Sequence, residues 1–210
     1  LGASAFIAEK GPPGFDFGQK EKKLGIRASA TRELVFRDCF VPRGNLIAKE
    51  GMGFIVTMRT FDRTRPGVGA QGVGVAQGAL DEAVRYARER EQFEKKIISF
   101  QAVQHLLADM ATLVEAARAL VLSVARYVDQ EKNPKDISKL SGMAKVFASD
   151  VAMKVTIDAV QVFGGYGYMR EYPVEKMMRD AKILQIYEGT NQIQRNVIGL
   201  ELNKEYAGKK

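Results

Sequence analysis

The sequence contains few of the residues that build covalent cross-links or metal sites. Among its 210 residues are one cysteine, Cys39, one histidine, His105, and no tryptophan. A single cysteine excludes an internal disulfide framework and is typical of a reducing compartment. A single histidine excludes a metal site with several histidine ligands. No apolar run approaches the roughly 20 residues that a membrane-spanning helix requires, and the first residues lack the basic head of a signal peptide.

A strong excess of one charge is also absent. The chain carries 32 basic and 25 acidic residues, and the net charge of +7 is spread along the sequence. Its basic clusters, 20–27 and 85–96, lack the interleaved aromatic residues of a surface that stacks nucleic acid bases. We therefore expect no nucleic-acid partner. The modest excess favours a phosphorylated cofactor, an acidic partner or simple solubility.

Short apolar stretches between turn signals predict β-strands in the first 50 residues. The candidates are 4–9, 23–27 and 33–40, and the run 11–14, Gly-Pro-Pro-Gly, is a strong turn signal. These strands are too few, and begin too abruptly, for a complete sheet. We therefore expect residues 1–50 to be part of an antiparallel β domain.

Residues 51–210 have helical apolar periodicity and predict an up-and-down helical bundle, so the fold class is mainly α. The clearest of the expected helices, 101–128, carries one apolar stripe. We expect one helix to end at about Phe61 and the next to begin at Thr64, with Thr64 as the cap and Pro66 in the first turn. The expected helices are about 53–61, 64–90, 101–128, 134–163, 173–180 and 191–206.

Closely spaced glycines in the second expected helix superficially resemble a nucleotide-binding fingerprint. The run Gly72-Val-Gly-Val-Ala-Gln-Gly78 has the wrong final spacing and does not follow a strand directly. We therefore reject a dinucleotide-binding fold and expect these small residues to let helices approach closely.

Glu188 follows an apolar run and precedes Gly189, which can adopt a positive φ, and Thr190, which can cap a following helix. We expect it to lie in a short, partly buried connection between helices. Burial among apolar neighbours disfavours a charged carboxylate and suits a general base. The alternative is a solvated loop glutamate without special chemistry.

Five blocks of sequence, in this order and over nearly the whole chain, resemble the acyl-CoA dehydrogenase family. They are Phe61-Asp-Arg-Thr-Arg-Pro66, Arg90-Glu-Gln-Phe93 with Phe100-Gln101, Val160-Gln-Val-Phe-Gly-Gly-Tyr-Gly167, Glu171-Tyr-Pro-Val-Glu-Lys-Met-Met-Arg-Asp180 and Ile186-Tyr-Glu-Gly-Thr190. The resemblance implies that the chain is the second half of the middle β domain, 1–50, plus the C-terminal domain, 51–210, an up-and-down four-helix bundle. A fragment, a split subunit and a processed form all remain open.

The resemblance implies FAD-dependent α,β-dehydrogenation of acyl-CoA thioesters of the short- to medium-chain type, as in fatty acid β-oxidation. Glu188 would remove the Cα proton while the Cβ hydrogen leaves as hydride. The thioester oxygen would be stabilised by the backbone N–H of Glu188 and a flavin ribityl hydroxyl. The implied partners are an electron-transfer flavoprotein and further copies of the chain in a homodimer or homotetramer. The implied location is a bacterial cytoplasm or a mitochondrial matrix.

The resemblance also implies the binding residues. The expected FAD contacts are Arg90, Gln101, Gln161, Val162, Phe163, Gly164, Gly165, Thr190, Asn191 and Gln192. Arg90 and Gln101 would reach the FAD of a neighbouring subunit. The expected substrate residues are Asp62, Arg63, Thr64, Arg65 and Gly189.

Both groups of residues could also have purely structural roles. The Asp62–Arg65 block could equally form a structural ion-pair network, and Arg90 alone could be a solvated helix-end cation. A minority of relatives place the base at the position of Thr64, where this chain has no acid, and this favours Glu188 as the base.

One block departs from the family pattern. After Phe93 the family usually has Gly, a residue, then Pro, and this chain has Glu94-Lys-Lys96. We expect a looser turn there, with weaker FAD binding and weaker dimer contacts. A non-catalytic helical subunit and an oxidase-like relative that passes electrons to oxygen remain alternatives.

Overall fold

The structure is a computed structural model that describes residues 2–130 and 133–207. It divides into two compact units, Leu1–Phe61 and Asp62–Lys210. The predicted fold class is confirmed, because the described residues are mainly helical with short antiparallel strand pairs. The change from strands to helices comes at Gly53, and the expected domain boundary at residue 50 stays a prediction.

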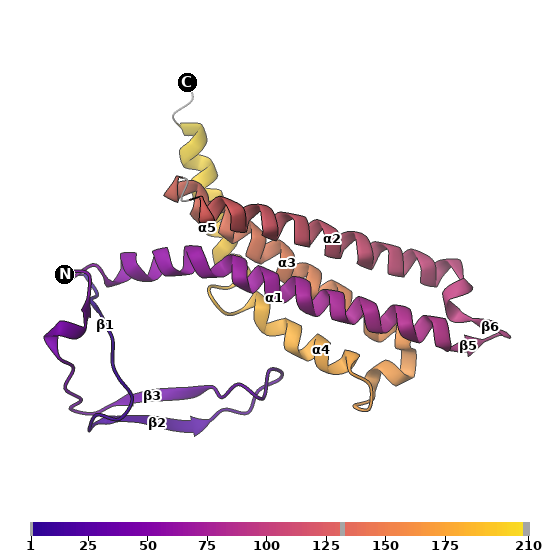
Figure 1. The fold of residues 1–210 in the computed structure, drawn as a ribbon, viewed down its shortest axis with the longest axis horizontal. Helices are drawn as coiled ribbons and strands as arrows, with labels where there is room; N and C mark the ends of the chain where they lie inside the picture. Colours follow the sequence, from indigo (N-terminus) through magenta and orange to yellow (C-terminus); the bar gives the residue numbers. More distant parts are fainter. Residues whose placement is uncertain (1, 131–132, 208–210) are drawn as a thin grey trace. The chain divides into compact units, whose positions relative to one another are not determined.

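The first unit contains two antiparallel strand pairs (Figure 1). Strand β1 (Ala5–Phe6) pairs with β4 (Leu46–Ile47), and β2 (Phe15–Lys20) pairs with β3 (Arg32–Phe36). The β2–β3 pair is held on one face by the rings of Phe15 and Phe36, which stack with centroids 4.7 Å apart. The 3-10 helix η1 (Arg43–Asn45) leads into β4.

The strand predictions were only partly correct. The expected strands 4–9 and 33–40 are shorter, and the sequence analysis missed β2. Residues 23–27 form no strand. Ile26 has a φ of 44°, and the side chain of Lys23 donates to the Ser29 carbonyl at 2.6 Å, so local contacts close a turn there instead.

The expected break at Thr64 is wrong, because α1 runs without interruption over Gly53–Glu89. Pro66 lies inside this helix and has no N–H to donate to the carbonyl of Asp62 four residues earlier. The Ser141 hydroxyl of another helix donates to that carbonyl at 2.6 Å. The carbonyl is therefore satisfied by a residue distant in sequence, and Thr64 is not a helix cap.

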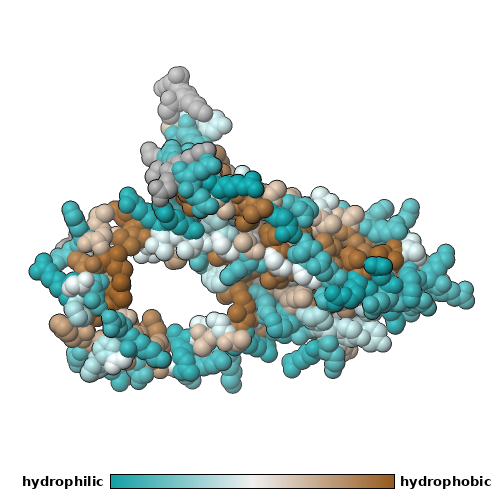
Figure 2. All heavy atoms as spheres, in the orientation of Figure 1, coloured by the Kyte–Doolittle hydropathy of each residue, from teal (hydrophilic) through white to brown (hydrophobic). Residues whose placement is uncertain are grey.

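The second unit is built from long helices with short connections (Figure 1). Helices α2 (Gln101–Asp129) and α3 (Pro134–Phe163) pack side by side, and α3 also contacts α4 (Val174–Ala181) and α5 (Asn191–Ala207). In Figure 2 hydrophilic side chains cover much of the visible surface of these helices. The remaining elements are β5 (Glu91–Gln92), β6 (Lys95–Lys96), η2 (Ile97–Ser99), η3 (Gly164–Tyr168) and η4 (Lys182–Gln185).

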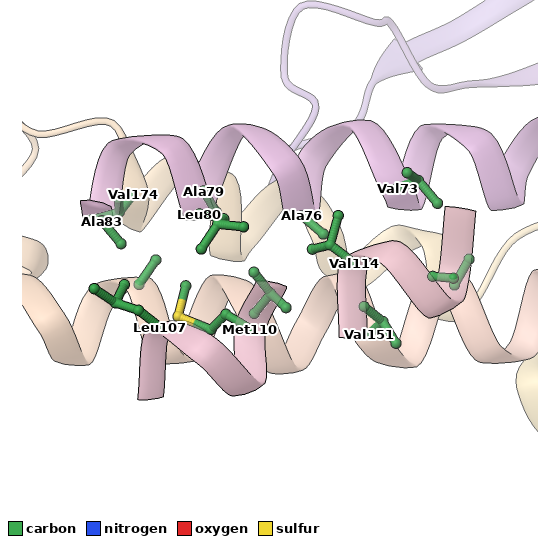
Figure 3. Packing of buried hydrophobic residues seen from close by; sticks show 14 of the residues in the cluster. Val73, Ala76, Ala79, Leu80, Ala83, Leu107, Met110, Val114, Val151 and Val174 are labelled. Carbon is green, nitrogen blue, oxygen red and sulfur yellow. The ribbon is translucent and has the colours of Figure 1, made fainter. Parts of the chain in front are cut away.

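The core of the second unit lies between α1, α2, α3 and α4 (Figure 3). The apolar stripe predicted for 101–128 is confirmed, since it forms the buried face of α2. Leu107, Met110 and Val114 of this stripe pack against Leu80 and Ala76 of α1 (Figure 3). This packing fixes the register of α1 against the other helices, and α1 carries part of the site described below.

Two of the α1 glycines allow the close helix approach that the sequence predicts. A Cβ on Gly69 would lie 2.9 Å from the side chain of Val121, and a Cβ on Gly72 would lie 2.8 Å from the carbonyl oxygen of Ala148. A Cβ on Gly67 or Gly74 would meet no atom within 4 Å. The expectation therefore holds for Gly69 and Gly72 but not for Gly67 or Gly74.

Substitution of these glycines by alanine is expected to have opposite effects within one helix. Gly72→Ala should lower the free energy of unfolding by about 1–3 kcal/mol, because the new methyl group collides with backbone of α3. Gly74→Ala should raise it by up to about 1 kcal/mol, because alanine is the better helix former and the site has room. Chemical denaturation measures both, and changes of the same sign would contradict the packing described for α1 and α3.

Candidate active site

Glu188 lies in the connection between η4 and α5, in a strained backbone conformation. Its φ is 51°, and that of Gly189 is 90°. A Cβ on Gly189 would lie 2.4 Å from the side-chain nitrogen of Gln194, so this position has no room for a side chain. The expected turn at Gly189, and the partly buried connection between helices, are confirmed.

The expected cap at Thr190 is also confirmed. Its hydroxyl accepts a hydrogen bond from the Ile193 N–H at 3.3 Å, in the first turn of α5. The Thr190 carbonyl accepts from the Gln194 N–H at 2.9 Å, which starts the helical hydrogen-bond pattern. The end of the Glu188 loop is therefore joined firmly to a helix.

The Glu188 carboxylate faces α1. The Thr64 hydroxyl donates to its Oε2 at 2.7 Å. Its Oε1 and its backbone N–H form no hydrogen bond to the residues that the structure describes. The carboxylate therefore has one oxygen fixed in place and one oxygen available to a substrate, next to an available N–H.

Arg65 joins the Glu188 loop to a buried ion pair. Its side chain is 2% exposed, and it contacts the Asp62 carboxylate at 2.8 Å. Its Nε donates to the Glu188 carbonyl at 3.2 Å, and Gln194 donates to the same carbonyl at 3.3 Å. Arg65 thus belongs to a structural ion pair and also touches the loop. Of the expected substrate residues, Arg63 and Thr64 are exposed and Asp62 is partly buried.

Burial dominates the titration of this pair. It raises the pKa of Asp62 above its ordinary value, and the neighbouring Arg65 only partly opposes the effect. Burial likewise lowers the pKa of Arg65, against the stabilising carboxylates of Asp62 and Glu188. The two charges are therefore held in a site that disfavours both unless they remain together.

Lys145 of α3 is a buried cation beneath the same loop, and the sequence analysis missed it. Its side chain is fully buried, and its Nζ donates to the Gly189 carbonyl at 2.9 Å and to Asn191 Oδ1 at 2.8 Å. Burial lowers the pKa of its ammonium from 10.5 to about 8, and the nearby positive charge of Arg65 acts in the same direction.

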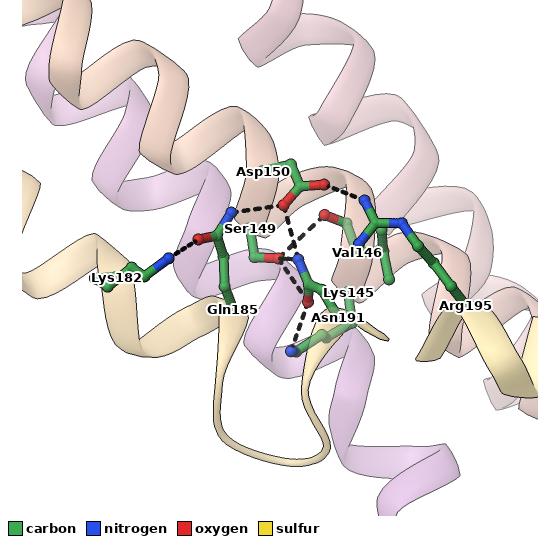
Figure 4. A network of polar contacts seen from close by, with 8 residues as sticks. All are labelled: Lys145, Val146, Ser149, Asp150, Lys182, Gln185, Asn191 and Arg195. Carbon is green, nitrogen blue, oxygen red and sulfur yellow. Dashed lines mark hydrogen bonds and ion pairs between the residues drawn. The ribbon is translucent and has the colours of Figure 1, made fainter. Parts of the chain in front are cut away.

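Asp150, also on α3, contacts residues on both sides of the loop (Figure 4). Its Oδ1 accepts from Gln185 at 2.6 Å and from Asn191 at 2.8 Å, and its Oδ2 accepts from Arg195 at 2.7 Å. Ser149 completes the network through a hydrogen bond from Asn191 at 2.9 Å. One carboxylate thus connects the residue before the loop with residues after it.

A sequence signal for this network exists. Ser141, Lys145 and Ser149 are spaced four residues apart, so they form one polar stripe along one face of α3. A polar stripe that faces a core must find partners. Lys145 and Ser149 find their partner in Asn191, more than 40 residues later, whereas Ser141 bonds with Asp62 of α1, and neither partner can be read from this spacing.

The depressed pKa of Lys145 predicts that stability rises with pH. The unfolded lysine keeps its proton up to pH 10.5, whereas the folded one loses it near pH 8. Between these values the unfolded state binds more protons, so the free energy of unfolding increases by about 2–3 kcal/mol across the window. Chemical denaturation of the wild type and of Lys145→Met at pH values from 7.5 to 10.5 measures this rise in the free energy of unfolding. A rise of equal size in both proteins would contradict the assignment to Lys145.

A second group of the expected residues surrounds a separate pocket. Its volume is about 570 Å³, and it contains the guanidinium of Arg90, whose central carbon lies 5.4 Å from the Tyr166 ring centre. A Cβ on Gly164 or Gly165 would meet no atom within 4 Å, so their backbone faces open space. The pocket is lined by Tyr86, Arg90, Gln92, Ile97, Val162, Phe163, Gly164, Gly165, Tyr166 and Met169.

The expected cofactor residues therefore fall into two places. Thr64, which touches Glu188, and Arg90 are 26 positions apart along or just beyond α1, about 39 Å at the rise of an α-helix. Gln101 and Gln161 are exposed and do not line the Arg90 pocket. Gln192 is exposed at the start of α5.

The Asn191 side chain is committed to the interior. It is 3% exposed, and it bonds with Lys145, Ser149 and Asp150. Only its backbone therefore remains for an anion at the start of α5.

The segment around Glu94, where the sequence departs from the family pattern, forms a closed hairpin, whereas we expected a looser turn. Strands β5 and β6 pair across the two residues Phe93 and Glu94, with Glu91 opposite Lys96. Both turn residues have positive φ, 54° and 62°, as a two-residue hairpin of this kind requires. Such turns prefer glycine or asparagine, so the chain closes this turn with strained residues.

Two further findings concern absences. The helices of the described ranges 2–130 and 133–207 include none that could cross a membrane. Among these same residues, no cluster of histidine, cysteine, aspartate or glutamate could hold a metal ion.

The chain is similar to proteins of one family. A family model described as acyl-CoA dehydrogenase, C-terminal domain, matches residues 51–202. The probable acyl-CoA dehydrogenase FadE25 of Mycobacterium tuberculosis is 54% identical over 201 residues, 96% of this chain and 51% of the relative. The chain thus spans about half the length of the curated relatives it matches.

Solved structures agree with this match. Butyryl-CoA dehydrogenase from Megasphaera elsdenii has a TM-score of 0.92 and 51% identity, covering 95% of this chain and 51% of its own. A chain in a study of the electron transferring flavoprotein of Acidaminococcus fermentans has a TM-score of 0.92 and 56% identity, covering 95% and 52%. An acyl-CoA dehydrogenase complexed with FAD from Bacillus anthracis has a TM-score of 0.91 and 34% identity, covering 98% and 38%. The chain therefore belongs to the acyl-CoA dehydrogenase family.

Proposed function

We propose that this chain carries the catalytic base of an FAD-dependent acyl-CoA dehydrogenase acting on short- or medium-chain acyl-CoA thioesters. The observation that carries the proposal is the setting of Glu188. Its carboxylate has one oxygen held by Thr64, and its N–H is available beside the carboxylate. The names of the similar proteins support the reaction class, and the butyryl-CoA dehydrogenase supports a short acyl chain.

Three residues of the chain, Glu188, Thr64 and Arg65, have distinct roles in the proposed reaction. The Glu188 carboxylate removes the proton from Cα of the thioester, and the Cα–H electron pair becomes the new double bond as the Cβ hydrogen departs. Bound FAD supplies the acceptor for that hydride. The Glu188 N–H donates to the thioester oxygen while negative charge develops there. Thr64 orients the carboxylate, and Arg65 holds the backbone of the same residue.

The residues present fit an FAD group. The Arg90 guanidinium offers fixed donors for a pyrophosphate, and the open backbone of Gly164 and Gly165 permits close approach of a phosphate or ribose. At the other place, the first turn of α5 begins at the Thr190 cap and offers amides to an anion. Phe163 and Tyr86 stack at 4.1 Å and form a rigid apolar wall of the Arg90 pocket.

The separation of these two places supports an assembly of at least two copies. A distance of about 39 Å along one helix is too long for contacts to one FAD from both ends. We assign the Thr190 end to the FAD beside Glu188 of the same chain, and the Arg90 pocket to the FAD of a second copy. We also assign Gln101 to the FAD of the second copy, as the family resemblance implies.

The remaining partners follow the family. We propose an electron-transfer flavoprotein as the acceptor, and the similarity to a chain from a study of such a flavoprotein supports this choice. The reported relatives are bacterial, and this favours a bacterial cytoplasm over a mitochondrial matrix. We also propose that residues 1–50 belong to a β domain that the rest of the protein completes.

A visible spectrum of the purified protein that contains this chain tests the proposal. Anaerobic addition of acyl-CoAs of graded length should bleach a flavin band, most strongly at the preferred length. A flavin that no acyl-CoA bleaches, or a colourless protein that gains no band with added FAD, would contradict the proposed function and favour a non-catalytic helical subunit. Rapid reoxidation by air would instead indicate an oxidase.

A further inference from the structure

The backbone at Glu188 is in a conformation that it does not adopt unaided. A positive φ at a residue other than glycine is unfavourable, and it persists only where the surroundings hold it. Arg65 and Gln194 hold the carbonyl of Glu188 itself. The next carbonyl, that of Gly189, accepts from Lys145 at 2.9 Å. Two successive carbonyls are thus held from three helices, α1, α3 and α5.

Lys145 is well placed to hold the loop that carries Glu188, because it contacts that loop from α3. Its ammonium is fully buried, so no water competes for its hydrogen bonds. One bond goes to the loop, and the other goes to Asn191 at the first turn of α5. Because Lys145 is a residue of the packed helix α3, its hydrogen bond fixes the Gly189 carbonyl to a rigid element.

Asp150 fixes the two ends of the same loop. Gln185 precedes the loop and Asn191 follows it, and both donate to the same oxygen, Oδ1. One carboxylate on α3 therefore joins the two ends of the loop, and Figure 4 draws both hydrogen bonds. Asn191 bonds with both Lys145 and Asp150, so the two supports act as one network.

We propose that Lys145 and Asp150 are positioning residues that hold the backbone of Glu188 in its strained conformation and thereby set the position of its carboxylate. The inference rests on the proposed function of Glu188 as the base. Neither side chain touches the Glu188 carboxylate, so their effect passes through the Gly189 carbonyl and the loop ends. Misplacement of a reacting group by about 1 Å can cost on the order of 10²-fold in rate.

The test replaces each residue by one of similar shape. Lys145→Met keeps an unbranched side chain, one atom shorter than lysine, but loses both hydrogen bonds. In the FAD-loaded protein we expect kcat to fall on the order of 10²-fold, while KM for butyryl-CoA and FAD content change less than about threefold. Asp150→Asn keeps the shape and weakens the connection of the loop ends, with an expected loss in kcat on the order of tenfold.

Matched controls lie on the same helix. Lys139→Met removes an ion pair from α3 to Glu205 of α5 that does not touch the loop. Asp158→Asn removes an ion pair with Lys154, two turns further along α3. Both controls should keep wild-type kcat. Amide hydrogen exchange of the peptide containing 186–190 should increase in Lys145→Met and Asp150→Asn but not in the controls.

The outcomes separate this inference from the proposed function. If Lys145→Met retains kcat within about threefold of the wild type, or if kcat falls equally in Lys139→Met, the inference is overturned. If Lys145→Met does not fold, Asp150→Asn decides by the same criteria, because its side chain is only partly buried. Activity retained by Glu188→Gln would overturn the proposed function. The exchange of 186–190 would still report whether α3 holds the loop.

Discussion

Replacement of Glu188 by glutamine is expected to lower kcat by about 10²–10⁴-fold, the usual contribution of a positioned general base. Glutamine has the same shape and can still accept the hydrogen bond from Thr64. It cannot accept the Cα proton. The Glu188 N–H is unchanged, so binding of the thioester should be largely retained. Rapid-reaction measurement of flavin bleaching by acyl-CoA, with FAD content determined in parallel, gives the effect.

The control for this variant is a glutamate that has no role in the site. Glu115 of α2 forms an exposed ion pair with Arg118. Glu115→Gln should therefore keep the activity of the wild type. If Glu188→Gln bleached its flavin at a rate close to that of Glu115→Gln, the base would have to be sought elsewhere in the protein.

Loss of Arg65 is expected to have the largest effect on stability. Arg65→Met should lower the free energy of unfolding by about 3–5 kcal/mol, because it leaves the partly buried carboxylate of Asp62 without its cation. The variant also removes one of the two donors to the Glu188 carbonyl. The site around Glu188 should consequently be disturbed together with the fold.

The same helix offers a control with matched geometry. Arg85 pairs with Glu82 three residues earlier, as Arg65 pairs with Asp62, and both contacts are 2.8 Å long. The Arg85 side chain is 63% exposed, however, whereas that of Arg65 is 2% exposed. Arg85→Met should therefore cost only about 0–1 kcal/mol. Equal losses in urea denaturation would show that burial of Arg65 does not determine its contribution.

The helices were predictable because their apolar spacing is local information. The stripe on 101–128 and the cap at Thr190 follow from residues within a few positions of each other, and the structure confirms both. The continuation of α1 through Pro66 was not predictable. It depends on the hydroxyl of Ser141, which is 75 residues away in the sequence.

The loop that carries Glu188 was predictable from the sequence, but the buried residues that hold this loop were not. The apolar approach to Glu188, Gly189 and Thr190 indicates the loop, its turn and its cap. Lys145 and Asp150 could not be assigned, because their partners come from the far end of the chain and most of them are carbonyl and amide groups. Such groups occur in every sequence and leave no distinct pattern.

The distance between the two groups of cofactor residues required the structure. The resemblance already assigns Arg90 to the FAD of a neighbouring subunit, and the length of α1 adds that Arg90 lies about 39 Å along that helix from Thr64, which contacts Glu188. This spacing connects a property of one chain, the length of a helix, with the proposal that two copies complete each site.

The central claim is that Glu188 removes the α-proton of an acyl-CoA. The most direct test incubates the FAD-loaded protein with butyryl-CoA in D₂O and measures deuterium at Cα by mass spectrometry. The wild type is expected to exchange this position at a rate comparable with turnover, and Glu188→Gln should not exchange it above the buffer rate. Exchange by Glu188→Gln at the wild-type rate would contradict the assignment of Glu188 as the base.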